Sequence, residues 1–200
     1  MRRLARRSTL LSLLLVLFIV GSASAATANV SMTENVFTPQ AVTIKAGDSV
    51  MWTNDGAVAH TSTDDAPFLW DSGSVAVGDS FTFDFTAGGK YPYHCTFHQD
   101  LGMFGTISVR ISATPPSGPP GTLFTITVAS VDASVPFRYD IMQKNPGEPF
   151  KPLFSIRTKS FIFDSTGQPP GKYQFKSRLR NANTMAKSLF SPVRSITVTP

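Results

Sequence analysis

The sequence predicts an all-β protein built from two small sandwiches. Short segments rich in β-branched and aromatic residues recur along the chain, and Gly, Pro, Asn or Asp residues bound them. No segment after the first 25 residues keeps a helical hydrophobic period. The length of 200 residues suits two small domains better than one.

The expected strands form two groups. The first group comprises residues 33–37, 41–45, 49–53, 80–86, 90–95 and 105–111. In the second group, alternation marks residues 123–128, 137–143 and 173–179. Residues 112–121, rich in Pro and Gly, predict a semi-stiff linker between the groups. The expected domains are therefore residues 26–111 and 122–200.

The first 25 residues have the three parts of a secretory signal peptide. Four arginines precede an apolar run at residues 10–20, and Ala23-Ser24-Ala25 supplies small residues for cleavage. The apolar run is shorter than the roughly 20 residues that a membrane-spanning helix needs. The sequence thus predicts a signal peptide at residues 1–25 and an exported protein, located in the extracellular space, the cell envelope or the periplasm.

Charge is distributed unevenly between the two expected domains. Residues 26–111 hold three Lys/Arg against nine Asp/Glu, a net of −6, and residues 112–200 hold eleven against four, a net of +7. An acidic first domain would steer towards a basic redox partner. A basic second domain could lie on an anionic envelope polymer or membrane surface. No stacking or groove-reading motif accompanies the basic residues, so we expect no nucleic-acid binding.

One loop after an aromatic strand carries three residue types that bind metals. Cys95, the only cysteine, precedes His98 by three positions, and Met103 follows five positions later. Thiolate, imidazole and thioether together suit copper, and two histidines with one cysteine and a weak axial methionine form blue-copper electron-transfer sites. The chain holds only one other histidine outside this loop region, His60, so we expect it to complete the set.

Other interpretations remain open for each residue. Taken alone, Cys95 could be a buried hydrophobic residue or half of an intermolecular disulfide, and Met103 could be core packing. Their joint spacing favours copper. Strand alternation places His94 on the face opposite Cys95, so we expect His94 to point away from the metal.

Residues 30–111 resemble the plastocyanin and pseudoazurin branch of the cupredoxins. The resemblance rests on the segment 46–54, on Gly89 and its aromatic strand, on Cys95-Thr96-Phe97-His98 and on Met103-Phe104-Gly105. It implies a Greek-key sandwich that holds one type 1 copper per chain through His60, Cys95, His98 and Met103. Phe97 departs from the family pattern, where proline is common before the second histidine.

The resemblance implies an electron carrier rather than an enzyme, passing single electrons between redox proteins such as cytochromes or oxidases. It also implies that electrons leave through the edge of His98, inside an apolar rim that Ala57, Val58, Phe97, Leu101, Gly102 and Phe104 could supply. A copper enzyme is one alternative, but only His94 would remain for a second copper. Another is copper binding or delivery, or an envelope-associated binding module, without redox turnover.

The second half resembles a fibronectin type III or immunoglobulin-like module. Residues 171–181 are similar to the tyrosine-bearing late strand of such modules, and Phe190-Ser191-Pro192 follows. Val128 stands where these modules usually place a tryptophan. This half has no His or Cys, so we expect no metal site of its own.

Overall fold

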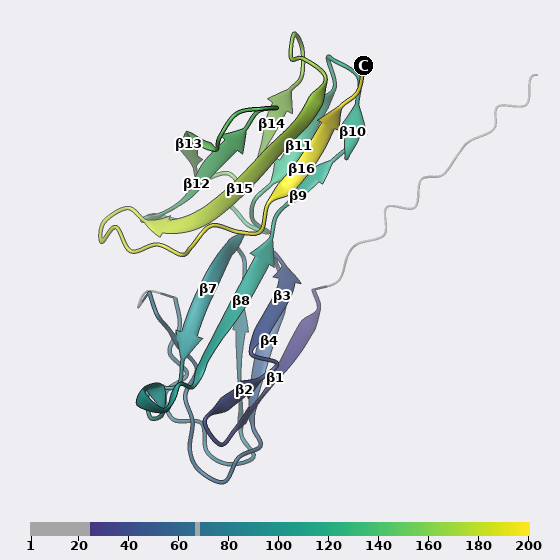
Figure 1. The fold of residues 1–200 in the computed structure, drawn as a ribbon. Helices are drawn as coiled ribbons and strands as arrows, with labels where there is room; N and C mark the ends of the chain where they lie inside the picture. The colour runs from purple at the N-terminus through teal and green to yellow at the C-terminus, as the bar shows by residue number, and fades with distance from the viewer. Residues whose placement is uncertain (1–24, 67–68) are drawn as a thin grey trace, which may run out of the picture.

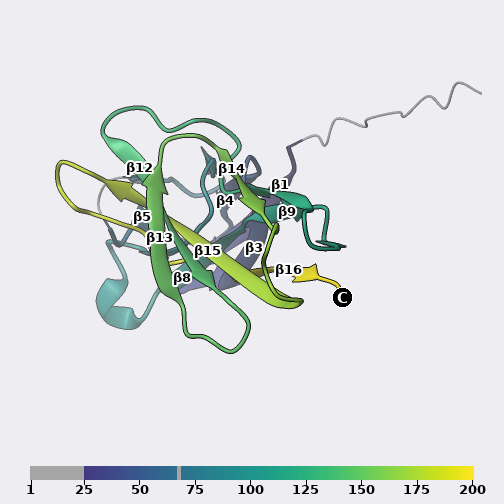
Figure 2. The ribbon, with the colours of Figure 1, turned by 90° about the horizontal axis from the view of Figure 1, so that it is seen from above.

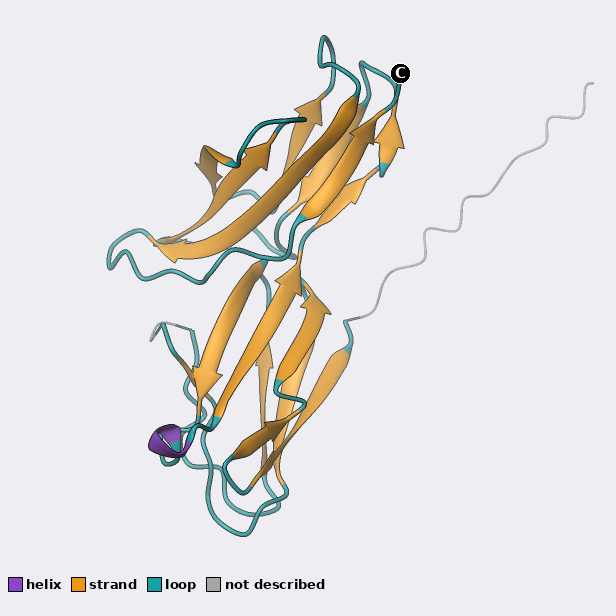
Figure 3. Ribbon diagram, viewed as in Figure 1, coloured by secondary structure: helices purple, strands orange, loops and turns teal. Residues whose placement is uncertain are grey.

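The computed structural model describes residues 25–66 and 69–200. The expected signal peptide lies outside these residues, apart from Ala25. Strands dominate the described chain, and its one helical turn is the 3-10 helix η1 (Gln99–Leu101), as Figure 3 shows. No helical segment in these ranges has the length and apolar character that a membrane span requires. The expected all-β class is confirmed.

The first module is a sandwich of two four-stranded sheets (Figure 1). Its strands are β1 (Thr27–Thr33), β2 (Val36–Thr38), β3 (Ala41–Lys45), β4 (Ser49–Asn54), β5 (Thr63–Asp64), β6 (Ser80–Asp84), β7 (Gly89–His94) and β8 (Phe104–Arg110). One sheet has the order β2-β1-β4-β6 and the other the order β3-β8-β7-β5. Each sheet contains one parallel pair, β1 with β4 and β3 with β8, and antiparallel pairs otherwise.

The second module is another small sandwich, as expected. Its strands are β9 (Ser112–Thr114), β10 (Ser117–Gly118), β11 (Leu123–Thr127), β12 (Phe137–Lys144), β13 (Lys151–Ile156), β14 (Ser160–Asp164), β15 (Gly171–Asn181) and β16 (Arg194–Val198). They form a three-stranded sheet, β14-β11-β9, and a five-stranded sheet, β10-β16-β15-β12-β13.

Two local expectations differ from the structure. Residues 33–37 are not one strand: β1 ends at Thr33, and Asn35 has a φ of 61° in the turn that leads antiparallel into β2. Asn tolerates this left-handed conformation better than most residues, so it turns the chain there. Residues 112–118, expected as part of a linker, form β9 and β10, which pair with β11 and β16. Proline is tolerated beside such short edge strands.

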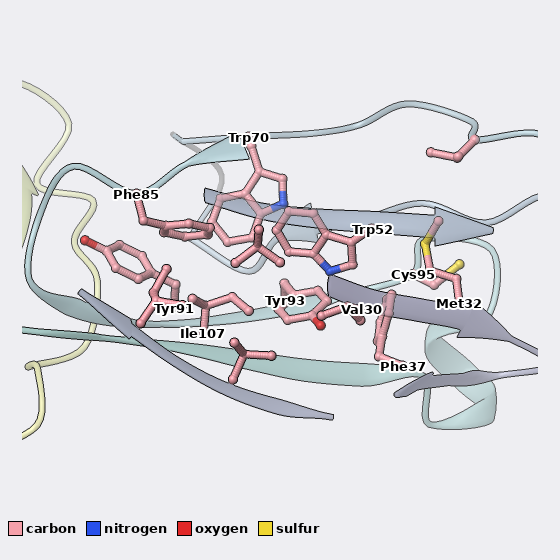
Figure 4. Packing of buried hydrophobic residues seen from close by; sticks show 14 of the residues in the cluster. Val30, Met32, Phe37, Trp52, Trp70, Phe85, Tyr91, Tyr93, Cys95 and Ile107 are labelled. Carbon is pink, nitrogen blue, oxygen red and sulfur yellow. The ribbon is translucent and has the colours of Figure 1, made fainter. Parts of the chain in front are cut away.

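An aromatic core fills the first module and ends at the predicted metal loop. Trp52 lies 5.5 Å from Tyr93 and 6.0 Å from Trp70 between ring centroids. Figure 4 shows Cys95 at one end of this buried cluster and Tyr91 towards the other, with Trp52 and Tyr93 between them. The alternation of β7 produces this arrangement, because its aromatic positions all face inward.

The two modules stack end to end and are joined by backbone hydrogen bonds. Figure 2, seen from above, places the strands of the second module over the first. Gly88 N–H donates to the carbonyl of Val128 at 2.8 Å, and Lys90 and Leu189 exchange two hydrogen bonds of 2.9 and 3.0 Å. The chain passes from β8 to β9 through Ile111 alone, and Ile111 is buried in the core of the second module. The 3-10 turn lies at the opposite end of the first module (Figure 1).

A methyl group at Gly88 should disrupt this junction. An added Cβ would lie 2.3 Å from Ile111 Cγ2 and 3.0 Å from the carbonyl oxygen of Val128, and the second contact is backbone. We expect Gly88→Ala to lower the free energy of unfolding by about 1–3 kcal/mol, the usual cost of overpacking. Thermal denaturation measures this, with Thr86→Ala as a nearby exposed control. A Gly88→Ala protein as stable as the control would contradict the packing described here.

A side chain at Gly105 should also destabilise the fold, because Gly105 faces the ring of Tyr93 across the β7–β8 pair. An added Cβ would lie 2.2 Å from Cζ of Tyr93, a fully buried ring that has no room to move away. We expect Gly105→Ala to cost about 1–3 kcal/mol of unfolding free energy in urea titrations. Ser108→Ala, on the half-exposed face of the same strand, should change it by less than about 0.5 kcal/mol. Equal effects of the two substitutions would argue against this contact.

Candidate metal site

The site forms where two loops meet at the end of the first module. His60 lies in the loop after β4, and Cys95, His98 and Met103 lie in the loop between β7 and β8. The backbone of His60 forms an antiparallel bridge with Val75, with hydrogen bonds of 3.2 and 2.8 Å. This bridge fixes the direction from which the His60 side chain enters the site.

A buried asparagine shapes the loop that leads to His60. Asn54 donates through Nδ2 to the carbonyls of Val58 at 2.8 Å and Val75 at 2.9 Å, and its Oδ1 accepts from Gly56 N–H at 3.0 Å. Gly56 also leaves room for the imidazole, since a Cβ there would lie 3.0 Å from Nε2 of His60. Sequence reasoning did not single out Asn54, although an Asn before Asp-Gly at a strand end is a turn signal.

Backbone hydrogen bonds within the second loop make it compact. Cys95 N–H donates to the carbonyl of Met103 at 3.1 Å, while the carbonyl of His98 accepts from Met103 N–H at 3.2 Å. The helix η1 ends at Gly102, whose φ of 82° is the left-handed conformation that glycine adopts without strain. These hydrogen bonds hold Cys95, His98 and Met103 close together in one compact loop.

The donor atoms of both loops converge. The Sγ atom of Cys95 lies 3.7 Å from Nδ1 of His60 and 3.4 Å from Nδ1 of His98. Ligand atoms about 2.0–2.3 Å from one ion stand roughly 3.5 Å apart at tetrahedral angles, so these separations suit a shared metal. In the described part of the chain, His60, Cys95 and His98 are also the one group of three or more such side chains that could hold an ion.

Two threonines connect the loops around the sulfur. Thr61 N–H donates to Sγ of Cys95 at 3.3 Å, and Thr96 N–H donates to Oγ1 of Thr61 at 2.8 Å. The first bond would stabilise a thiolate, the form of cysteine that binds metals. Sequence reasoning missed this role of Thr61, since only the fold brings it beside a residue 34 positions away.

The surroundings of His60 favour its neutral form. Burial lowers the pKa of His60 below its ordinary value, and the neighbouring His98 lowers it further, while Glu34 partly opposes both. A neutral imidazole is the form that binds a metal. Nε2 of His60 is buried and has no hydrogen-bond partner among the described residues.

The other predicted residues take different positions. Met103 is fully buried at the end of the same core cluster as Cys95. His94 faces the other side of β7, where its Nδ1 lies 2.6 Å from Oδ1 of Asp65. His98 is only partly buried, so its ring reaches the surface next to the exposed Phe97.

Comparison with known proteins supports the identity of the metal. Residues 24–110 match the family described as copper binding proteins, plastocyanin/azurin family. A chloroplastic plastocyanin from Tetradesmus obliquus is 39% identical over 85 residues, which cover 38% of this chain and 59% of that protein. The plastocyanin of Scenedesmus fuscus is 36% identical over 85 residues, covering 38% of this chain and 87% of the relative.

Solved cupredoxin structures are also similar to part of the chain. A purple cupredoxin from Nitrosopumilus maritimus is 26% identical, covers 42% of this chain and 99% of its own, and has a TM-score of 0.39. The family match covers the first module, which contains His60, Cys95 and His98. The chain belongs to the plastocyanin/azurin family of copper-binding proteins.

Proposed function

We propose that this protein carries single electrons by means of one type 1 copper held by His60, Cys95, His98 and Met103. The observation that carries the proposal is the convergence of the Cys95 sulfur and two imidazole nitrogens within 3.4 and 3.7 Å. Copper bound to such a set supplies a one-electron redox couple. The buried thioether of Met103 is available as the weak fourth ligand.

The protein around these residues favours electron transfer over copper delivery. A carrier needs a site that changes little between oxidation states, and backbone hydrogen bonds fix both ligand loops. A delivery protein needs a ligand set that opens easily, whereas Cys95, His60 and Met103 are all fully buried. A second copper for catalysis would need further imidazoles, and the remaining histidine, His94, is paired with Asp65. We therefore propose a carrier and not an enzyme.

We propose that electrons leave through the edge of His98, inside an apolar rim. We define the rim by its exposed residues: Ala57, Val58, Phe97, Leu101, Gly102 and Phe104. Such a surface suits the small, brief contacts that redox proteins make. The second module packs at the opposite end of the first, so it leaves this rim uncovered (Figure 1).

The partners and the location follow from charge and from the N-terminal sequence. We propose export, directed by the signal peptide at residues 1–25, and partners among basic redox proteins such as cytochromes or oxidases. The net charge of −6 over residues 26–111 supports such pairing. The net charge of +7 over residues 112–200 supports contact of the second module with an anionic envelope polymer or membrane surface.

We also propose that the second module is of the fibronectin type III or immunoglobulin-like kind. Tyr173, in β15, donates from its hydroxyl to the carbonyl of Pro169 at 2.9 Å. A tyrosine at the start of a late strand that bonds back to the preceding corner is typical of these sandwiches. The split into sheets of three and five strands is compatible with that assignment.

Copper reconstitution tests the proposed ligands. Addition of Cu(II) to the metal-free protein should give an intense visible absorption, because a thiolate bound to Cu(II) transfers charge to the metal. Cys95→Ser should abolish this band, since it removes the thiolate. His94→Gln is the matched control, because it alters the neighbouring residue but no proposed ligand, and should keep the band. A colourless wild-type product, or loss of the band in His94→Gln, would refute the assignment.

A charge introduced into the rim tests the proposed exit. Leu101 is 65% exposed, and Leu101→Glu should slow electron exchange with a soluble cytochrome by at least about tenfold, because a charge would have to be desolvated in the contact. Val135, 68% exposed in the second module, provides the control Val135→Glu. Stopped-flow kinetics measures both rates. Electron exchange at the wild-type rate in Leu101→Glu would place the exit elsewhere.

A further inference from the structure

A crevice at the junction of the two modules is lined by four basic side chains from both of them. It has a volume of about 420 Å³, and its basic lining residues are Lys45, Arg110, Lys159 and Arg194. No Asp or Glu lines it. Neither the metal site nor the rim involves any of these residues, so the crevice is independent of the proposed electron transfer.

The fold itself forces the positive charges together. Lys45 and Arg110 are neighbours in the parallel β3–β8 pair, at the strand ends that face the second module. From the second module, Arg194 begins β16 and Lys159 directly precedes β14. The hydrogen bonds at Gly88 and Lys90 hold the modules in contact, so the two pairs of cations cannot separate freely.

The crevice lacks sufficient counter-charge of its own. Among the described residues, none of the four cations has a carboxylate oxygen within 4.0 Å. Asp132 is one nearby acidic group, and its Oδ1 accepts from Lys159 N–H at 2.7 Å. Asp48 is another. Burial opposes its ionisation, yet the amides of Ala26 and Lys45 and the charges of Lys45 and Arg110 together hold its pKa below the usual value. Two carboxylates outside the crevice leave its four cations in excess.

Arg194 has a donor that nothing satisfies. Its terminal nitrogen donates to the carbonyl of Ala113 at 3.2 Å, which fixes the guanidinium against β9. Its Nε is buried and has no hydrogen-bond partner in the described chain. Leaving a buried charged donor unpaired is costly. The other arginine cluster is different, because Arg178 and Arg180 both bond to Asp140.

We propose that this crevice binds a tetrahedral oxyanion, a phosphate or sulfate group, which links the two modules. Guanidinium groups donate to such oxygens in a planar fork, and ammonium groups add charge. The bound anion would screen the repulsion between the cations of the first module and those of the second. A free ion and a lipid headgroup present the same oxyanion, so the chemistry of recognition is the same for both sources.

Calorimetric titration of the copper-loaded protein with sodium phosphate, at constant ionic strength set by sodium chloride, tests the proposal. We expect one binding event per chain and a higher melting temperature in phosphate, because a ligand that binds only the folded state stabilises it. Arg194→Gln and Lys159→Gln should each weaken binding by about tenfold or more, which corresponds to about 1.4 kcal/mol. Lys159 is exposed and its side chain has no bonding role in the fold, so this variant should fold even if Arg194→Gln does not.

Lys172→Gln is the matched control, since it removes the same charge from an exposed lysine outside the crevice. It should bind phosphate as the wild type does. Sedimentation with phosphatidic acid vesicles, against phosphatidylcholine vesicles, identifies the source. Binding to these vesicles but not to phosphate, with loss in Lys159→Gln alone, would assign a headgroup. Absence of both interactions, or equal effects of Lys159→Gln and Lys172→Gln, would overturn the site.

Discussion

The structure of the first module depends on one convergence: a cysteine sulfur meets two imidazoles that arrive on different loops. His60 and Cys95 are 35 positions apart in sequence, and their donor atoms are 3.7 Å apart in space. No local propensity produces this contact. It exists because each loop is fixed by backbone bonds at its base and because the amide of Thr61 donates to the sulfur. If either loop moved, the donors would separate.

The aromatic core explains why the loops can stay in place. Tyr93 packs between Trp52 and Phe37 with its ring against Gly105, two residues beyond Met103. A close-packed interior has low compressibility, so the residues at its edge are held in place. The second module adds to this rigidity at the far end, where its backbone bonds to residues 86–90, and it leaves the metal end open to partners.

Much of the candidate site could be predicted from sequence, because its residues are chemically distinctive. A single cysteine, three histidines and the spacing to Met103 leave few choices, and strand alternation separates His94 from Cys95. The supporting residues could not be predicted in the same way. Asn54 and Thr61 have ordinary side chains, and they act through contacts that the fold alone creates. That Met103 is a ligand stays a prediction.

Single residues and short segments explain the errors in the expected strands. A β-rich run at residues 33–37 predicts one strand, but Asn35 reverses the chain there. Composition at residues 112–121 predicts a linker, whereas residues 112–114 and 117–118 form short edge strands with the prolines outside them. Ala87 and Ile111, from the first expected domain, belong to the core of the second module. Tertiary packing creates this shared core, and no sequence pattern predicts it. Sequence patterns therefore indicate two domains but do not fix where each one ends.

Anomalous X-ray diffraction from crystals of the copper-loaded protein, collected at the copper edge, tests the central claim most directly. The account predicts one strong anomalous peak per chain, within bonding distance of Sγ of Cys95 and of Nδ1 of both His60 and His98. A peak at another position, or a peak that one of these three atoms does not reach, would contradict it.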